Sequence, residues 1–343
     1  DRDLNDKVSS AYLMVEPWKL LEALDKKMNS LNPNINKLAI KIMEEGPDLS
    51  TDTDIANVPK GQPEVEHKLE TDDIVTVWGP PGTGKTYTMA KIANSYIAQG
   101  KSILIVSHSN VSVDGVIKQV VKMLGTDKQS ILEDGKILRF GYVRDDELSQ
   151  NPYATSFNYA LSKCDSYARQ LEHLMAKRDE LRAKNQMKSK EYDEVEHKIK
   201  EIRGEIRKEE RKYVERAQVI GTTISRATID PMFEERQFDL VMFDEVSMAY
   251  VPQVIAAAAL AKEKFMCVGD FRQLAPISQS PDSRVLQVDI FSYLQIVDGK
   301  GNMYWHPWLV MLNEQRRMAP AISEFPSKFI YNRLLKDNAE VIN

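Results

Sequence analysis

The feature that most constrains the fold is a glycine-rich stretch between a strand-like run and a helix-like run. Residues 79–86 read Gly-Pro-Pro-Gly-Thr-Gly-Lys-Thr, which satisfies the pattern G-x-x-x-x-G-K-[ST]. The β-branched run 74–78 precedes it, and a helical pattern over 87–98 follows it. This order predicts a loop whose backbone N–H groups surround a phosphate, with the N-terminus of the helix adding positive charge.

Each residue type in this loop has a chemical reason. Glycine lets the backbone approach a phosphate without a Cβ clash. Lys85 is placed to bridge the β- and γ-phosphates, and the Thr86 hydroxyl to ligate Mg²⁺. A turn kept only for steric reasons fits the Gly-Lys-Thr ending less well. The predicted nucleotide-binding residues are therefore Gly79, Pro80, Pro81, Gly82, Thr83, Gly84, Lys85, Thr86 and Tyr87.

Two acids follow the buried run 239–243, at the strand end where α/β sheets place their chemistry. Asp244 is placed to hold Mg²⁺ through water, and Glu245 to orient and deprotonate an attacking water. Acid pairs at strand ends are also common as solvated surface. Beside a phosphate loop the catalytic interpretation is the stronger one.

A third polar loop, residues 269–276, follows the strand-like run 265–268 and reads Gly-Asp-Phe-Arg-Gln-Leu-Ala-Pro. Gln273 is placed to sense the γ-phosphate. Asp270 can support either the metal shell or that glutamine. A polar loop without a role fits the order of the motifs less well.

The pattern of apolar runs predicts an α/β fold. Helical patterns lie between most of the strand-like runs, and such alternation is typical of a parallel sheet covered by helices on both faces. The predicted buried strands are 74–78, 102–106, 218–222, 239–243 and 265–268.

One segment, residues 155–216, interrupts this alternation. It is charged, helical and nearly free of Gly and Pro, and apolar residues recur in it at intervals of three and four. Because its middle is polar, it predicts an antiparallel, coiled-coil-like helical hairpin, a stalk inserted into the α/β domain. A single long helix is the alternative. Such a hairpin can be a solvated arm, dock a protein partner or guide nucleic acid.

The beginning of the chain is less informative. Pro17 is expected in the first turn of one helix, and a second helix is expected to run over 37–43 and stop at Gly46. Residues 47–57 read as a linker. The chain starts at Asp1 without Met, so we expect a fragment of a longer protein.

Composition excludes several classes. The 343 residues carry a net charge of −5, which argues against a surface covered in positive charge, although a local basic groove stays possible. Cys164 and Cys267 are too far apart to indicate a disulfide framework, and no zinc spacing occurs. No apolar run is long enough for a membrane helix. We expect a cytoplasmic protein, or a nuclear one in a eukaryote.

Five motifs in this order resemble the superfamily-one B helicases, in particular the nonsense-mediated-decay helicase, senataxin and their bacterial relatives. The resemblance spans about residues 62–335 and implies a RecA-like P-loop NTPase sheet that uses ATP and Mg²⁺. The motifs lie at 79–86, 109–114 (Ser-Asn-Val-Ser-Val-Asp), 244–247 (Asp-Glu-Val-Ser), 269–276 and 315–322 (Gln-Arg-Arg-Met-Ala-Pro-Ala-Ile).

The resemblance also implies roles for residues outside the phosphate loop. Ser109 and Asn110 would contact a nucleic-acid backbone, as would Thr222 and Thr223, for which capping of a turn is the alternative. Gln315 and Arg317 match the motif that opens a second RecA-like domain. Arg317 would reach the γ-phosphate as an arginine finger. Phe325 and residues 329–331 match an aromatic helix that is expected only to pack.

The sequence departs from the family pattern in three ways. Arg316 replaces the usual tyrosine that stacks on adenine, although an arginine plane can also stack on a base. Gln62 lies at the distance expected for the adenine-reading glutamine, but Gly61 and Pro63 beside it fit the pattern poorly. The late motifs of the second domain are absent, so we expect this chain alone to be weakly active.

We therefore predict a helical segment and linker over 1–58, a RecA-like ATPase domain over 59–305, and the start of a second RecA-like domain over 306–343. ATP would be hydrolysed in the cleft between the two domains, with movement on single-stranded DNA or RNA, 5′ to 3′ by resemblance. The catalytic set is Lys85, Asp244, Glu245, Gln273 and Arg317. The alternatives are an ATP-driven switch that binds nucleic acid or a protein, through the stalk or the N-terminal segment, and a P-loop enzyme such as a small-molecule kinase.

Overall fold

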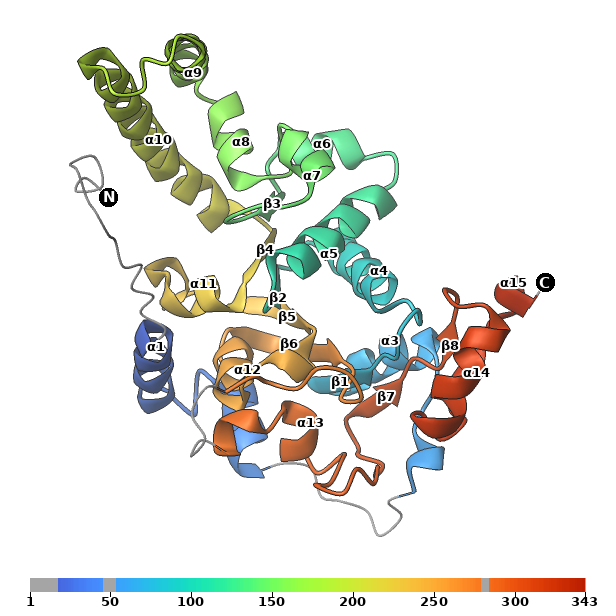
Figure 1. Ribbon diagram of the computed structural model, residues 1–343. Helices are drawn as coiled ribbons and strands as arrows, with labels where there is room; N and C mark the ends of the chain where they lie inside the picture. The colour runs from blue at the N-terminus through green and yellow to red at the C-terminus, as the bar shows by residue number, and fades with distance from the viewer. Residues whose placement is uncertain (1–17, 46–53, 279–283, 343) are drawn as a thin grey trace, which may run out of the picture.

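The computed structural model describes residues 18–45, 54–278 and 284–342, and its centre is a seven-stranded parallel sheet (Figure 1). The strand order is β3-β4-β2-β5-β6-β1-β7. All five predicted strands are present, and the sheet gains β3 at one edge and β7 at the other. The strands are β1 (Ile74–Trp78), β2 (Ile103–Ser107), β3 (Ile137–Arg139), β4 (Val219–Thr223), β5 (Phe238–Asp244), β6 (Ala261–Gly269) and β7 (Leu309–Met311).

Helices cover both faces of this sheet, as predicted (Figure 1). Alternate strand residues enter opposite cores: Ile103 and Ile105 pack on one side, Leu104 and Val106 on the other. The first face carries α3 (Gln62–Thr71), α4 (Lys85–Ala98) and α5 (Asn110–Met123). The second carries α2 (Lys37–Ile40), α11 (Ile224–Ile229), α12 (Val251–Ala258) and α13 (Ile290–Tyr293).

The described part of the N-terminal region packs onto the second face and is not a separate segment. Helix α1 (Trp18–Asn29) contacts α11 and α12. The helical prediction over 37–43 is confirmed by α2 and the π-helical turn Lys41–Glu45. The linker prediction is wrong at its end, because Ile55–Asn57 forms a 3-10 helix whose Ile55 is buried in the core. Pro17 and residues 46–53 lie outside the described part.

The inserted segment is a helical hairpin, as predicted, and it projects away from the sheet (Figure 1). A short helix, α8 (Ser156–Ser162), leads into α9 (Asp165–Ala183), and residues 184–189 connect α9 to α10 (Lys190–Arg216). The contact between the two long helices excludes the single-helix alternative. The hairpin has its own small core of Leu171, Leu181, Val195, Ile199 and Ile206. Along the chain, α6 (Lys128–Glu133) precedes β3 and α7 (Asp146–Gln150) follows it.

The chain leaves the main sheet only after β7. This strand pairs in parallel with β1, so the predicted boundary at residue 306 falls before a strand of the first sheet. Beyond it, β8 (Glu314–Gln315) and β9 (Lys336–Asp337) form a separate two-stranded parallel sheet. Helix α14 (Pro320–Phe329) connects these two strands, and α15 (Ala339–Ile342) follows.

The aromatic residues of α14 do not all pack, contrary to expectation. Phe325 and Phe329 are each 64% exposed, and their ring centroids lie 4.9 Å apart. Tyr331, in contrast, is buried. Within the described residues, no helix combines the length and the apolar content needed to cross a membrane.

A buried histidine before β7 gives the first prediction. His306 is 1% exposed, and its Nδ1 accepts a hydrogen bond from the Trp308 backbone N–H at 3.1 Å. Burial, helped by Lys68, lowers the pKa of His306 to about 4. The unfolded chain therefore binds the extra proton between about pH 6.5 and 4, and folding stability falls as pH falls through this window.

We expect His306→Asn, which keeps a side-chain acceptor, to reduce this pH dependence. Between pH 7 and pH 5 the native chain should lose about 2 kcal/mol more than the variant, as measured by chemical denaturation at both values. His197→Asn in α10, at an exposed position, serves as the control. Equal losses in the native chain and the His306 variant would contradict the assignment.

Candidate functional site

The glycine-rich loop joins β1 to α4 as the sequence predicts. Gly82 and Gly84 have φ of +77° and +84°, the left-handed region that favours glycine. A Cβ on Gly79 would overlap the Lys85 side chain. The Thr83 hydroxyl donates to the Pro80 carbonyl at 2.7 Å and so fixes the turn. These positions leave little room for other residues.

Lys85 is the first residue of α4 and reaches back over the loop. Its Nζ donates to the Gly79 carbonyl at 3.1 Å and lies 3.6 Å from Glu245 Oε1. The N-cap of the helix is Gly84, and among the described residues no side chain caps it. The first N–H groups of α4 are therefore left for a ligand, and together with Lys85 they favour an anion.

The predicted acids lie at the end of β5, two strands from β1. Asp244 is 4% exposed, and in the part of the chain that the structure describes its Oδ1 meets no hydrogen-bond partner. Burial and the neighbouring Glu245 raise the pKa of Asp244 to about 7, against the effect of Lys85. A buried carboxylate oxygen without a partner suits a cation or its water shell, so the site fits the predicted Mg²⁺.

Glu245 reaches the phosphate loop from an unusual backbone conformation. Its φ is +53°, a left-handed value that is uncommon for residues other than glycine. This turn directs the side chain toward Lys85 instead of continuing the strand. Backbone strain of this kind concentrates at functional sites, which agrees with the role predicted for Glu245.

Gln273 lies in the loop that follows β6, the strand between β5 and β1. Gln273 Nε2 donates to Asp270 Oδ2 at 2.7 Å, and its backbone N–H donates to the Asp270 carbonyl at 3.0 Å. Asp270 itself is completely buried. Of the two roles open for Asp270, the structure shows contact with the glutamine.

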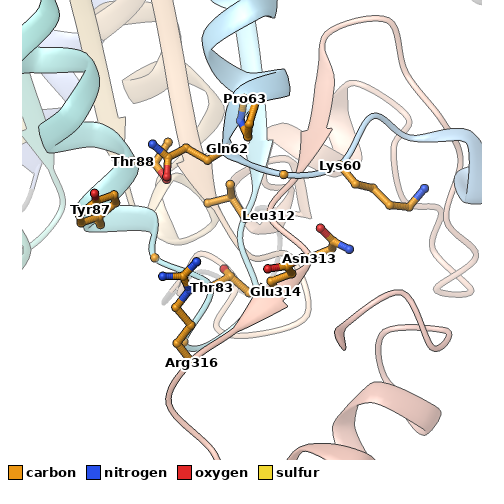
Figure 2. A pocket seen from close by; sticks show the side chains of 13 residues that line it. Lys60, Gln62, Pro63, Thr83, Tyr87, Thr88, Leu312, Asn313, Glu314 and Arg316 are labelled. Carbon is orange, nitrogen blue, oxygen red and sulfur yellow. The ribbon is translucent and has the colours of Figure 1, made fainter. Parts of the chain in front are cut away.

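A pocket of about 510 Å³ opens beside the phosphate loop (Figure 2). Gln62, Tyr87 and Arg316 all line it, although they lie far apart in the sequence. Gln62 Nε2 donates to Glu66 Oε1 at 2.8 Å, which leaves its carbonyl oxygen as an acceptor. Lys60, Asn313 and Glu314 also line the pocket and were not predicted; the only signal for the last two is that they precede Gln315 directly.

Gln315 does not face this pocket, contrary to its predicted role. It is fully buried, and its Oε1 accepts the backbone N–H groups of Arg317 and Met318 at 2.9 and 2.7 Å. Its Nε2 donates to the Met318 carbonyl and to Asp337. The side chain shapes the turn that carries Arg317 and has no capacity left for a nucleotide.

That turn lies against the phosphate loop. The Arg316 backbone N–H donates to the Gly82 carbonyl at 2.9 Å. A Cβ on Gly82 would lie 2.7 Å from Arg317 Cβ. Arg317 is exposed and lies beside the loop, and its reach to a γ-phosphate stays a prediction.

The predicted nucleic-acid residues lie at the ends of β2 and β4, which are neighbours. Ser109 and Thr223 use their hydroxyls to cap α5 and α11, so the capping alternative describes Thr223 here. Asn110 Oδ1 accepts from Arg139 at 2.8 Å. Thr222 is fully buried, so its side chain cannot contact a nucleic acid bound at the surface. The predicted contact of Thr222 with a nucleic-acid backbone is therefore wrong in this conformation.

Parallel α/β sheets that carry such a loop, with acids at nearby strand ends, are P-loop nucleotide-binding domains, and this chain is of that RecA-like class. It belongs to the AAA domain family, whose sequence profile matches residues 60–281.

Two curated relatives confirm the resemblance found in the motifs. DNA polymerase alpha-associated DNA helicase A of Saccharomyces cerevisiae is 27% identical over 296 residues, covering 79% of this chain and 40% of that protein. The Regulator of nonsense transcripts 1 homolog of Arabidopsis thaliana is 26% identical over 280 residues, covering 78% and 20%. The chain thus spans less than half the length of either relative. Among solved structures, Arterivirus nonstructural protein 10 (helicase) with DNA matches 80% of this chain and 44% of that chain, with 15% identity and a TM-score of 0.37.

Proposed function

We propose that this chain is the nucleotide-binding part of an ATP-dependent nucleic-acid helicase or translocase. The observation that carries the proposal is the approach of Lys85 Nζ, on the phosphate loop, to within 3.6 Å of Glu245 Oε1, at the end of β5. Phosphate binding needs the first group, and activation of water needs the second. The similarity to named helicases supports the same reading.

In the proposed reaction the loop N–H groups and Lys85 hold the β- and γ-phosphates. Glu245 accepts a proton from the water that attacks the γ-phosphorus, while the bond from that phosphorus to ADP breaks on the opposite side and ADP leaves. Gln273 would contact the same phosphate. Thr86 and Asp244 would hold Mg²⁺, which neutralises phosphate charge when it is bound. Arg317 adds positive charge from the facing side of the cleft.

The pocket beside the loop is proposed to take the nucleobase. Arg316 and Tyr87 offer planar groups for stacking, and Gln62 offers an amide for hydrogen bonding. The exposed side chain of Arg316 lies 3.8 Å from Glu340, so this contact would open when a base enters.

We propose that a second RecA-like domain begins at about residue 313 rather than 306. Strands β8 and β9 with α14 between them form a βαβ unit outside the main sheet. Movement of this unit relative to the first sheet would open and close the nucleotide site. A single strand of DNA or RNA would then be gripped across Ser109, Asn110 and Thr223, at the ends of β2 and β4.

The test is ATP hydrolysis by the full-length protein with and without single-stranded DNA and RNA. We expect one polymer to raise kcat at least about tenfold, because nucleic acid would complete the closed site. A strand-displacement assay separates the two remaining functions: stimulated hydrolysis without displacement favours a switch. Hydrolysis indifferent to both polymers would contradict the nucleic-acid part of the proposal.

A further inference from the structure

Asp270 is a completely buried carboxylate that collects donors from three separate parts of the chain. Its Oδ1 accepts from Trp78 Nε1 at 3.0 Å and from the Arg272 backbone N–H at 3.1 Å. Its Oδ2 accepts from Gln273 Nε2 and from the Tyr331 hydroxyl, both at 2.7 Å. Donors on both oxygens satisfy the charge that burial would otherwise make costly.

The carboxylate fixes which way the Gln273 amide faces. A carboxylate accepts hydrogen bonds, so the amide must turn its N–H₂ group toward Asp270. The carbonyl oxygen and one N–H of Gln273 are then left for the nucleotide site. Any shift of Asp270 Oδ2 would turn this amide, because the two groups share a short hydrogen bond.

Tyr331 brings the second donor to that same oxygen from 61 residues away. Its side chain is 2% exposed, and its ring lies 5.9 Å from that of Trp78. Burial and the nearby Asp270 raise the pKa of Tyr331, so the hydroxyl stays protonated and donates. The Tyr331 backbone N–H is held by the Pro326 carbonyl at 3.0 Å, at the end of α14.

The segment that carries Tyr331 also carries Arg317, and it is tied together internally. Asp337 of β9 accepts from both Gln315 of β8 and Ser323 of α14, each at 2.6 Å. The segment therefore touches the nucleotide site at two points: Arg316 against Gly82 of the phosphate loop, and Tyr331 against Asp270. A movement that brings Arg317 closer to the phosphates must also move the Tyr331 hydroxyl.

We propose that Tyr331 is a positioning residue that couples the placement of the 314–337 segment to the orientation of Gln273 through Asp270. The inference rests on the proposed ATPase function and goes beyond it, since it says how the position of the 314–337 segment would change the orientation of the Gln273 amide. Gln273 is held for catalysis when the hydroxyl is seated on Oδ2. Gln273 turns when the segment withdraws.

The test is Tyr331→Phe in the full-length protein, which removes one hydroxyl and keeps the ring. Tyr159→Phe is the matched control, because Tyr159 is also buried and its hydroxyl donates one hydrogen bond, to the Glu133 carbonyl at 3.0 Å, on α8 away from the nucleotide site. We expect Tyr331→Phe to lower the nucleic-acid-stimulated kcat about tenfold with KM for ATP unchanged. Backbone amides of residues 270–275 should also exchange hydrogen faster in this variant and not in the control.

The outcomes are distinguishable. Unchanged kcat in Tyr331→Phe, with an active native protein, would overturn the positioning role and leave the proposed function standing. Equal losses of kcat in both tyrosine variants would also overturn it, because a general loss of stability would then explain the result. A native protein without ATP hydrolysis would overturn the proposed function and the inference with it.

Discussion

Lys85→Ala is expected to weaken ATP binding about 100-fold or more, with no detectable hydrolysis at ordinary nucleotide concentrations. The lysine is the cation that reaches over the loop, 3.1 Å from the Gly79 carbonyl and 3.6 Å from Glu245. Its loss removes charge-assisted hydrogen bonds to two phosphates, which contribute about 3 kcal/mol together. Titration with a fluorescent ATP analogue measures the change directly.

Lys122→Ala is the charge-matched control for this experiment. Lys122 is exposed in the last turn of α5, away from the loop, so its removal should leave nucleotide affinity unchanged. If Lys85→Ala bound ATP as tightly as the control, the phosphate-binding role of this loop would be wrong.

Glu245→Gln is expected to separate binding from turnover. The substitution keeps the size of the side chain and removes its basicity, so kcat should fall about 100-fold or more. Nucleotide affinity should be kept or increased, because the negative charge opposite Lys85 is also removed. Single-turnover hydrolysis and equilibrium binding, measured on the same preparation, resolve the two effects.

The control for this variant is Glu263→Gln. Glu263 lies near the amino-terminal end of β6, at the opposite end of the strand from Gly269, and pairs with Lys101 at 2.9 Å. It should hydrolyse ATP at the native rate. Normal turnover by Glu245→Gln would refute the role of Glu245 as general base.

Much of the fold could be predicted because its main strands are continuous apolar runs and its hairpin has a clear helical period. β3 escaped prediction because it is three residues long and ends in Arg139. That arginine is fully buried, and its charge is paired with Asp114 at 2.6 Å; a partner 25 residues away leaves no local signal. β7 escaped for its length, since three residues show no period.

The same limit explains the outcome at the site. The positions of motif residues such as Lys85 and Glu245, which lie 3.6 Å apart beside the loop, could be predicted from the sequence. The role of Gln315 was wrong because its partners, Met318 and Asp337, consume its hydrogen-bonding capacity. The contact of Tyr331 with Asp270 could not be predicted, because nothing near either residue indicates that the chain brings them together.

The position of the hairpin has a consequence for changes in the length of its helices. The chain leaves the sheet from its edge strand β3 and returns on the neighbouring β4, while β2, β5 and β6 lie between β4 and the strand that carries the phosphate loop. The arm therefore joins the sheet at the side away from the phosphate loop. Lengthening or shortening α9 and α10 by whole helical turns would change the reach of the arm and leave the residues around Lys85 in place.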